Sequence, residues 1–187
     1  MATTKPVWNL ANGVTTARVL MVPLVIVVLV VGTPDASRWW AAALFTLAAA
    51  TDRLDGYLAR RLGQVTDWGK LLDPIADKAL IGGTLLTLSV LGEMPWWVTI
   101  VVLVRELGIT AMRLAVLRYV VIAASPGGKL KTVLQSVGIG FFLLPLDSLP
   151  DVVRVVAWVV LLAAVVITVV TGIDYLRRGL AVRAAAR

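Results

Sequence analysis

The stretch from Val155 to Ile173 holds nineteen residues without a single charged side chain. A helix of this length can cross the hydrocarbon core of a bilayer, which needs about 20 apolar residues. The whole chain is 59% hydrophobic and 16% charged, whereas soluble domains average about 45–50% apolar and about 25% charged residues. A soluble globule of this composition would expose large apolar patches. The sequence therefore indicates a membrane protein, not a soluble enzyme, a disordered chain or a nucleic-acid binder.

Six apolar blocks are separated by short breaks rich in glycine, proline and charge, which predicts an all-α polytopic membrane protein with six transmembrane helices. The expected helices are 14–32, 38–61, 69–92, 94–118, 129–147 and 151–177. In 187 residues this leaves little room for anything else, so a single membrane domain, 1–187, is expected. The run Val19–Val31 also resembles the apolar region of a signal peptide, but the spans that follow favour a transmembrane helix.

The basic residues predict the orientation. The chain has 18 Lys and Arg and a formal charge of +7. With alternating spans, only Arg38 and Arg154 fall in the connections on one side, and the other sixteen lie at the opposite helix ends. The positive-inside rule places those ends in the cytoplasm. We therefore expect a multi-pass protein of the inner or plasma membrane, with a polar cavity open to the cytoplasm.

Four aspartates lie inside the expected second and third helices: Asp52, Asp55, Asp73 and Asp77. Each would cost about 2.5–3.5 kcal/mol in hydrocarbon, so the group needs water or cations. The spacings i, i+3 and i, i+4 put each pair on one helix face, and a short return connection lets the pairs face each other. With no Cys and no His in the chain, metal binding and acid–base chemistry fall to carboxylates. Oxygen ligands suit Mg²⁺ or Mn²⁺, and four of them suit a two-metal site.

Small residues accompany the aspartates at Gly56, Ala59 and Gly69, where they would let a phosphate-bearing ligand approach the backbone closely. Two other interpretations remain open at this point. The aspartates could be structural ions paired with Arg53, Arg60 or Lys78, or an ion relay in a small transporter. Small residues also often serve helix packing alone. Eight residues in a fixed order across two helices favour a functional site.

The pattern D-x2-D-G-x2-A-R-x8-G-x3-D-x3-D resembles the signature of the CDP-alcohol phosphatidyltransferase family. All eight signature positions are present: Asp52, Asp55, Gly56, Ala59, Arg60, Gly69, Asp73 and Asp77. The resemblance implies a six-helix membrane enzyme, usually a homodimer, that cleaves the pyrophosphate of a CDP-linked lipid and transfers the phosphatidyl group to an alcohol. It also implies that the four aspartates bind two Mg²⁺ or Mn²⁺ ions and that Asp77 is the general base. The first seven signature residues would hold the CDP-lipid.

Basic residues within the later helices address the acceptor alcohol. Arg105 and Arg113 lie two turns apart on nearly one face, and Lys129 and Lys131 open the fifth expected helix. Together they predict a pocket for a phosphorylated acceptor. The alternative is plain positive-inside anchoring.

The stretches 15–18, 105–113 and 128–135 resemble the family members that use sn-glycerol 3-phosphate, which implies phosphatidylglycerophosphate and CMP as products. Inositol phosphate and phosphatidylglycerol remain alternative acceptors. A transporter would show ion-dependent flux and no cleavage of the CDP-lipid, which separates it from all of these.

Overall fold

The computed structural model describes the backbone of residues 10–32, 34–61, 67–116 and 126–185. These residues form six helices: α1 (Leu10–Val31), α2 (Pro34–Arg61), α3 (Asp67–Val90), α4 (Trp96–Val116), α5 (Pro126–Phe142) and α6 (Asp151–Ala185). The predicted all-helical chain with six helices is confirmed in this part of the protein.

Two helices differ from the expected bounds at their C-terminal ends. Helix α5 ends at Phe142 and not at residue 147, because Pro145 removes a donor and disfavours a helical residue before it. Helix α6 continues to Ala185 and not only to residue 177, since the residues beyond include leucine, alanine and arginine, which are strong helix formers.

Two segments are long and apolar enough to cross a membrane, namely Gly13–Val31 in α1 and Asp151–Arg177 in α6. In each of them, less than a third of the most apolar stretch is buried inside the protein. A mostly exposed apolar helix is expected where lipid covers its surface. These two helices, with the composition of the chain, fit a membrane protein.

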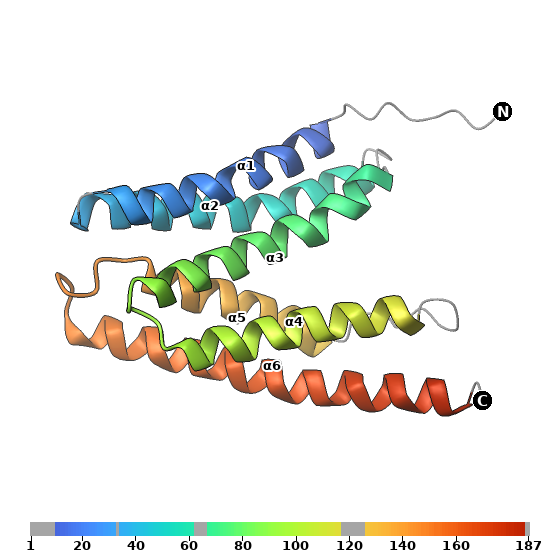
Figure 1. Ribbon diagram of the computed structural model, residues 1–187. Helices are drawn as coiled ribbons and strands as arrows, with labels where there is room; N and C mark the ends of the chain where they lie inside the picture. Colours follow the sequence, from blue (N-terminus) through green and yellow to red (C-terminus); the bar gives the residue numbers. More distant parts are fainter. Residues whose placement is uncertain (1–9, 33, 62–66, 117–125, 186–187) are drawn as a thin grey trace.

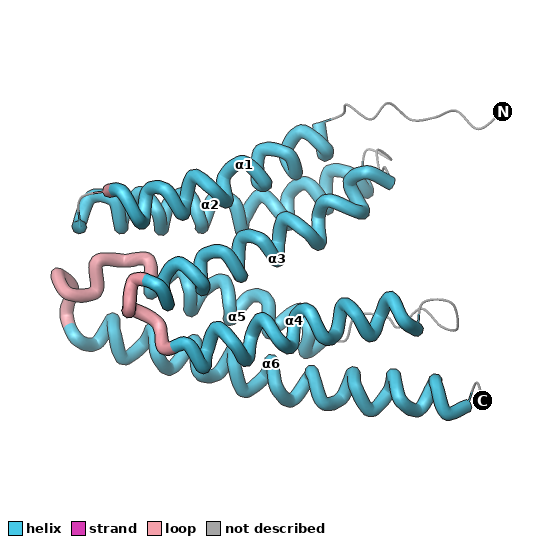
Figure 2. Tube along the Cα trace, in the orientation of Figure 1, coloured by secondary structure: helices cyan, strands magenta, loops and turns pink. Residues whose placement is uncertain are grey.

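The helices run side by side in one bundle (Figures 1 and 2). Helix α1 packs extensively against α2 and α3, while α6 packs against α5 and α4. The ends at which α1, α3 and α5 begin and α2, α4 and α6 end lie together, at the right of Figure 1. We call these ends the site end. The opposite end, which carries the turns 91–95 and 143–150, is the loop end.

Apolar side chains fill the middle of the bundle and its loop-end half. Phe45, Leu85 and Ile139 are among the largest fully buried side chains. At the loop end, the rings of Phe142 and Trp158 meet edge to face with their centroids 5.0 Å apart. The two buried charged side chains, Arg18 and Lys131, lie instead in the site-end halves of α1 and α5. Buried charge is therefore found towards the site end, whereas the polar side chains buried towards the loop end are uncharged serines and threonines.

Polar contacts join the turns at the loop end. Arg38 at the start of α2 pairs with Glu93 in the α3–α4 turn. Ser148 of the α5–α6 turn donates to Asp35 of α2 at 3.1 Å. The α3–α4 turn itself needs Gly92, whose φ is +78°, a conformation that other residues rarely adopt. These contacts join the start of α2 to both turns at the loop end.

Candidate active site

Two of the four signature aspartates face α1. Thr15 donates a hydrogen bond of 2.9 Å from Oγ1 to Oδ1 of Asp73, and Arg18 places Nη1 3.3 Å from Oδ1 of Asp77. Thr15 and Arg18 lie one turn apart on α1 and are both buried. Their i, i+3 spacing matches the one-turn spacing of the aspartates, so one face of α1 contacts one face of α3.

The Arg18–Asp77 pair is asymmetric in its exposure. The side chain of Arg18 is fully buried, whereas 40% of the Asp77 side chain remains exposed. The side chain of Asp77 therefore retains exposed surface for a ligand, while the buried guanidinium of Arg18 pairs with its carboxylate. An arginine in this position offsets the cost of placing a carboxylate within an apolar helix bundle.

Asp52 and Asp55 belong to α2, and their side chains, like those of Ala59 and Arg60, lie outside the described side chains. The same holds for the surroundings of Gly56 and Gly69. Among the described side chains, no group of three potential metal ligands is found. Asp73 and Asp77 nonetheless offer carboxylate oxygens one turn apart on a partly exposed face, and such oxygens are the ligands that Mg²⁺ and Mn²⁺ prefer. The described residues thus supply two carboxylates of the kind that a divalent metal would need.

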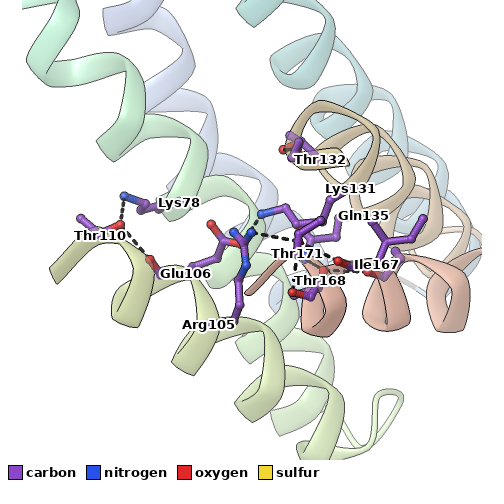
Figure 3. A network of polar contacts seen from close by, with 12 residues as sticks. Lys78, Arg105, Glu106, Thr110, Lys131, Thr132, Gln135, Ile167, Thr168 and Thr171 are labelled. Carbon is purple, nitrogen blue, oxygen red and sulfur yellow. Dashed lines mark hydrogen bonds and ion pairs between the residues drawn. The ribbon is translucent and has the colours of Figure 1, made fainter. Parts of the chain in front are cut away.

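A second cluster joins α4 and α5 (Figure 3). Oε1 of Glu106 accepts from Nη1 of Arg105 at 3.1 Å and also from Nζ of Lys131. Lys131 is almost fully buried, with 5% of its side chain exposed. Two of the four cations predicted for the acceptor are therefore brought to one point. The side chains of the other two, Arg113 and Lys129, lie outside the described side chains.

Helix α6 supports Arg105 from the other side. Nη2 of Arg105 donates to Oγ1 of Thr171 at 3.1 Å. The next residue, Gly172, is close enough that an added Cβ would lie 3.2 Å from Cγ of Arg105. Gly172 therefore makes room for the arginine stem, and Thr171 orients its guanidinium. Nε of Arg105 is buried and has no hydrogen-bond partner among the described residues.

Further polar contacts extend this cluster towards α3 (Figure 3). Lys78, which follows Asp77, donates 2.6 Å to Oγ1 of Thr110. Thr110 in turn donates 2.7 Å to the main-chain carbonyl of Glu106. On the other side, Gln135 donates 3.0 Å to Thr168. This network links the aspartate helix to the helices that carry the predicted acceptor cations.

An apolar groove of about 950 Å³ lies between α2, α3 and α5. Its wall on α2 runs from Trp39 to Ala50, roughly 16 Å of helix at 1.5 Å per residue. Asp77 of α3 and Thr132 of α5 also line it. The groove therefore connects an apolar surface directly to one of the signature aspartates.

Sequence reasoning missed several residues of this site. Thr15 and Arg18 were noted only as part of a resemblance, although two buried polar residues one turn apart on an apolar helix are a signal in their own right. Glu106 and Thr171 give no comparable signal, since their contacts join residues 25 and 66 positions apart.

The sequence profile of the CDP-alcohol phosphatidyltransferase family matches residues 8–170, so the chain belongs to this family of enzymes. It is 52% identical over 174 residues to the probable phosphatidylglycerophosphate synthase of Mycobacterium tuberculosis, covering 92% of this chain and 82% of the relative. It is 35% identical over 180 residues to the CDP-diacylglycerol–glycerol-3-phosphate 3-phosphatidyltransferase of Bacillus subtilis, covering 90% and 93% respectively. The protein of the same name from Rickettsia bellii is 34% identical over 172 residues, covering 90% and 94%.

Proposed function

We propose that this protein transfers the phosphatidyl group from CDP-diacylglycerol to sn-glycerol 3-phosphate, giving phosphatidylglycerophosphate and CMP in phospholipid synthesis. The observation that carries this proposal is the meeting of three features at Asp77. The carboxylate lies at an apolar groove, beside a second signature aspartate, and next to a lysine that is hydrogen-bonded into the Arg105–Lys131 cluster. The groove suits the lipid, the aspartates with bound metal would suit the pyrophosphate, and the cationic cluster suits an anionic acceptor.

The groove suits the acyl chains of the CDP-lipid. Apolar side chains and alanines dominate its lining, and its α2 wall extends over about half the thickness of a bilayer core of roughly 30 Å. A diacyl substrate lying there would bring its phosphate to the end where Asp77 is found. The CDP moiety would then lie over Asp52, Asp55, Gly56, Ala59, Arg60, Gly69 and Asp73.

Two divalent ions, Mg²⁺ or Mn²⁺, would be held by Asp52, Asp55, Asp73 and Asp77. Bound there, they would supply Lewis-acid stabilisation of the pyrophosphate and of the departing CMP. The chain's own residues prepare this site, because Thr15 fixes one carboxylate by a hydrogen bond and Arg18 fixes another by an ion pair. Such positioning favours catalysis, since reacting groups must be aligned closely.

Asp77 is our candidate for the general base that takes the proton from the acceptor hydroxyl. With no histidine in the chain, a carboxylate is the natural group for this step. Its exposed side reaches the groove, and its neighbour Lys78 points towards α4. An acceptor held at the α4–α5 cluster would therefore lie on the side of α3 that Lys78 faces.

The acceptor phosphate is assigned to Arg105, Arg113, Lys129 and Lys131. Support comes from the convergence of Arg105 and Lys131 on one oxygen position, 3.1 Å from Nη1 of Arg105. Cations that merely anchored helix ends at the membrane surface would face solvent or lipid headgroups. These two are instead largely buried between helices.

The proposed setting is a bilayer crossed by all six helices, with the site end facing the cytoplasm. The polar residues of the site end and the long apolar helices α1 and α6 support this arrangement. A homodimer is proposed from the family alone. Protease accessibility of tags at the loop end in sealed cells would test the orientation.

The function is tested with purified protein, CDP-diacylglycerol, Mg²⁺ or Mn²⁺ and a panel of acceptors. We expect CMP release with sn-glycerol 3-phosphate and none with inositol phosphate or phosphatidylglycerol. Absence of CMP release with glycerol phosphate would refute the proposal, and release with another acceptor would reassign the substrate. Ion-dependent flux in vesicles without cleavage of the CDP-lipid would indicate a transporter.

A further inference from the structure

Glu106 carries a negative charge, yet it lies between two of the cations predicted to bind the acceptor phosphate, Arg105 and Lys131. A single oxygen, Oε1, accepts from both Arg105 and Lys131. The side chain is 19% exposed, more than either of its partners. A carboxylate oxygen thus occupies the point on which the two cationic donors converge (Figure 3).

The cations around this point outnumber the carboxylates. Among the residues labelled in Figure 3, Lys78, Arg105 and Lys131 are cationic and Glu106 alone is anionic. Buried cations without a counter-charge are costly within a helix bundle in a membrane. Glu106 therefore lowers the cost of assembling the cluster when no acceptor is bound.

A phosphate that bridges Arg105 and Lys131 would have to occupy the position where Glu106 now accepts from both of them. Two anions at one point repel each other, and the repulsion is strong away from bulk water. Arg105 does not depend on Glu106 alone for its position, since Thr171 accepts from Nη2 and Gly172 accommodates its stem. The arginine can therefore stay in place while the carboxylate moves away.

We propose that Glu106 is a displaceable counter-ion: it holds the anion position of the pocket in the empty enzyme and yields it to the acceptor phosphate. This inference rests on the proposed function, because it takes the cluster to be the acceptor site. It assigns Glu106 a role in specificity. An acceptor must carry enough negative charge to compete with the carboxylate, so an alcohol without a phosphate gains no access to the two cations.

The test is Glu106→Gln, which keeps the shape and the accepting oxygen but removes the charge. We expect the KM for sn-glycerol 3-phosphate and the inhibition constant of inorganic phosphate to fall by about two- to fivefold, the size of one partly screened charge interaction. The KM for the CDP-lipid should not change. A side chain that merely positioned the cations would give the opposite result, a higher KM for the acceptor.

Glu93→Gln is the matched control, because it makes the same change in a carboxylate that pairs with Arg38 at the loop end. It should alter neither constant. Glu106→Asp is the second variant: its charge remains, but the shorter side chain cannot reach both cations. We expect an intermediate decrease in the acceptor KM, which keeps the test decisive even if Glu106→Gln fails to fold.

An unchanged or raised acceptor KM in the Glu106 variants would overturn the counter-ion role. The proposed function fails separately, if the wild-type enzyme releases no CMP with glycerol phosphate. In that case the rise in melting temperature caused by inorganic phosphate can still be measured for the wild type and for Glu106→Gln. A larger stabilisation of the variant supports the counter-ion role, and an equal or smaller one refutes it.

Discussion

The guanidinium of Arg18 lies 3.3 Å from the carboxylate of Asp77, and this ion pair joins a fully buried side chain of α1 to a partly exposed one of α3. Arg18 therefore contacts the proposed general base from α1, while the exposed part of the carboxylate side chain lines the apolar groove. The pair explains how a carboxylate can be held inside the apolar bundle without being covered.

Replacement of Asp77 by Asn should remove the proton acceptor and keep the shape. We expect CMP release to fall by about 10²–10⁴-fold, the usual contribution of a general base. The amide oxygen can still accept from Arg18, but the fully buried guanidinium loses its counter-charge, so the melting temperature in detergent should also fall, by roughly 2–4 °C for each kcal/mol lost.

Asp147→Asn is the control for this change, since Asp147 is fully exposed at the loop end. Activity and melting temperature should both match the wild type. Retention of more than a tenth of the wild-type turnover by Asp77→Asn would mean that another group takes the proton.

Thr15 tests the second contact between α1 and the aspartates. Thr15→Val keeps the shape but removes the 2.9 Å hydrogen bond to Asp73, and hydrogen bonds to charged groups contribute about 1.5–3 kcal/mol. We expect a loss of about tenfold or more in kcat, measured as CMP release at saturating substrates. Thr15→Ser retains the hydroxyl and should restore most of the activity. Equal activity of the Val and Ser variants would show that the bond is not needed.

The helices could be predicted from the sequence because hydrophobic blocks and Gly/Pro breaks are local signals. The uncharged run Val155–Ile173 lies within α6, and the break expected between 92 and 94 falls in the α3–α4 turn. The prediction failed where local signals compete. Pro145 ends α5 early despite the apolar residues around it, and α6 continues past its basic residues because they are good helix formers.

The aspartate signature could be read from spacing, but the contacts that hold it could not. Thr15 and Asp73 are 58 residues apart, and Arg105 and Thr171 are 66 apart. Such pairs depend on how whole helices pack, which no local pattern contains. The position of Glu106 shows the same limit, because its neighbour Arg105 is visible in the sequence and only the fold adds Lys131.

Gly172 gives a test of the acceptor pocket that leaves every charged residue unchanged. In Gly172→Ala the new Cβ would lie 3.2 Å from Cγ of Arg105, so the arginine must shift. We expect the KM for glycerol phosphate to rise several-fold while the KM for the CDP-lipid changes little. The matched control is Gly108→Ala on α4, where an added Cβ meets nothing within 4 Å. Equal effects of the two substitutions on the KM for glycerol phosphate would contradict a role of Arg105 in acceptor binding.

The apolar groove is tested at Gly140 of α5, which lines it and whose added Cβ would also meet nothing within 4 Å. Gly140→Leu should therefore be tolerated by the fold and place a branched side chain in the groove. We expect a several-fold higher KM for long-chain CDP-diacylglycerol, because the acyl chains lose apolar contact surface at roughly 25 cal/mol per Å².

Chain length separates this steric effect from a general one. A CDP-lipid with short acyl chains leaves the blocked part of the groove empty, so its KM should be nearly the same for Gly140→Leu and wild type. Gly140→Ala should behave as wild type with both lipids. By contrast, Gly138→Ala brings a Cβ to 3.0 Å from Cα of Leu161 on α6 and should lower the melting temperature without this chain-length dependence. If Gly140→Leu impaired both lipids equally, the acyl chains would have to lie elsewhere on the protein.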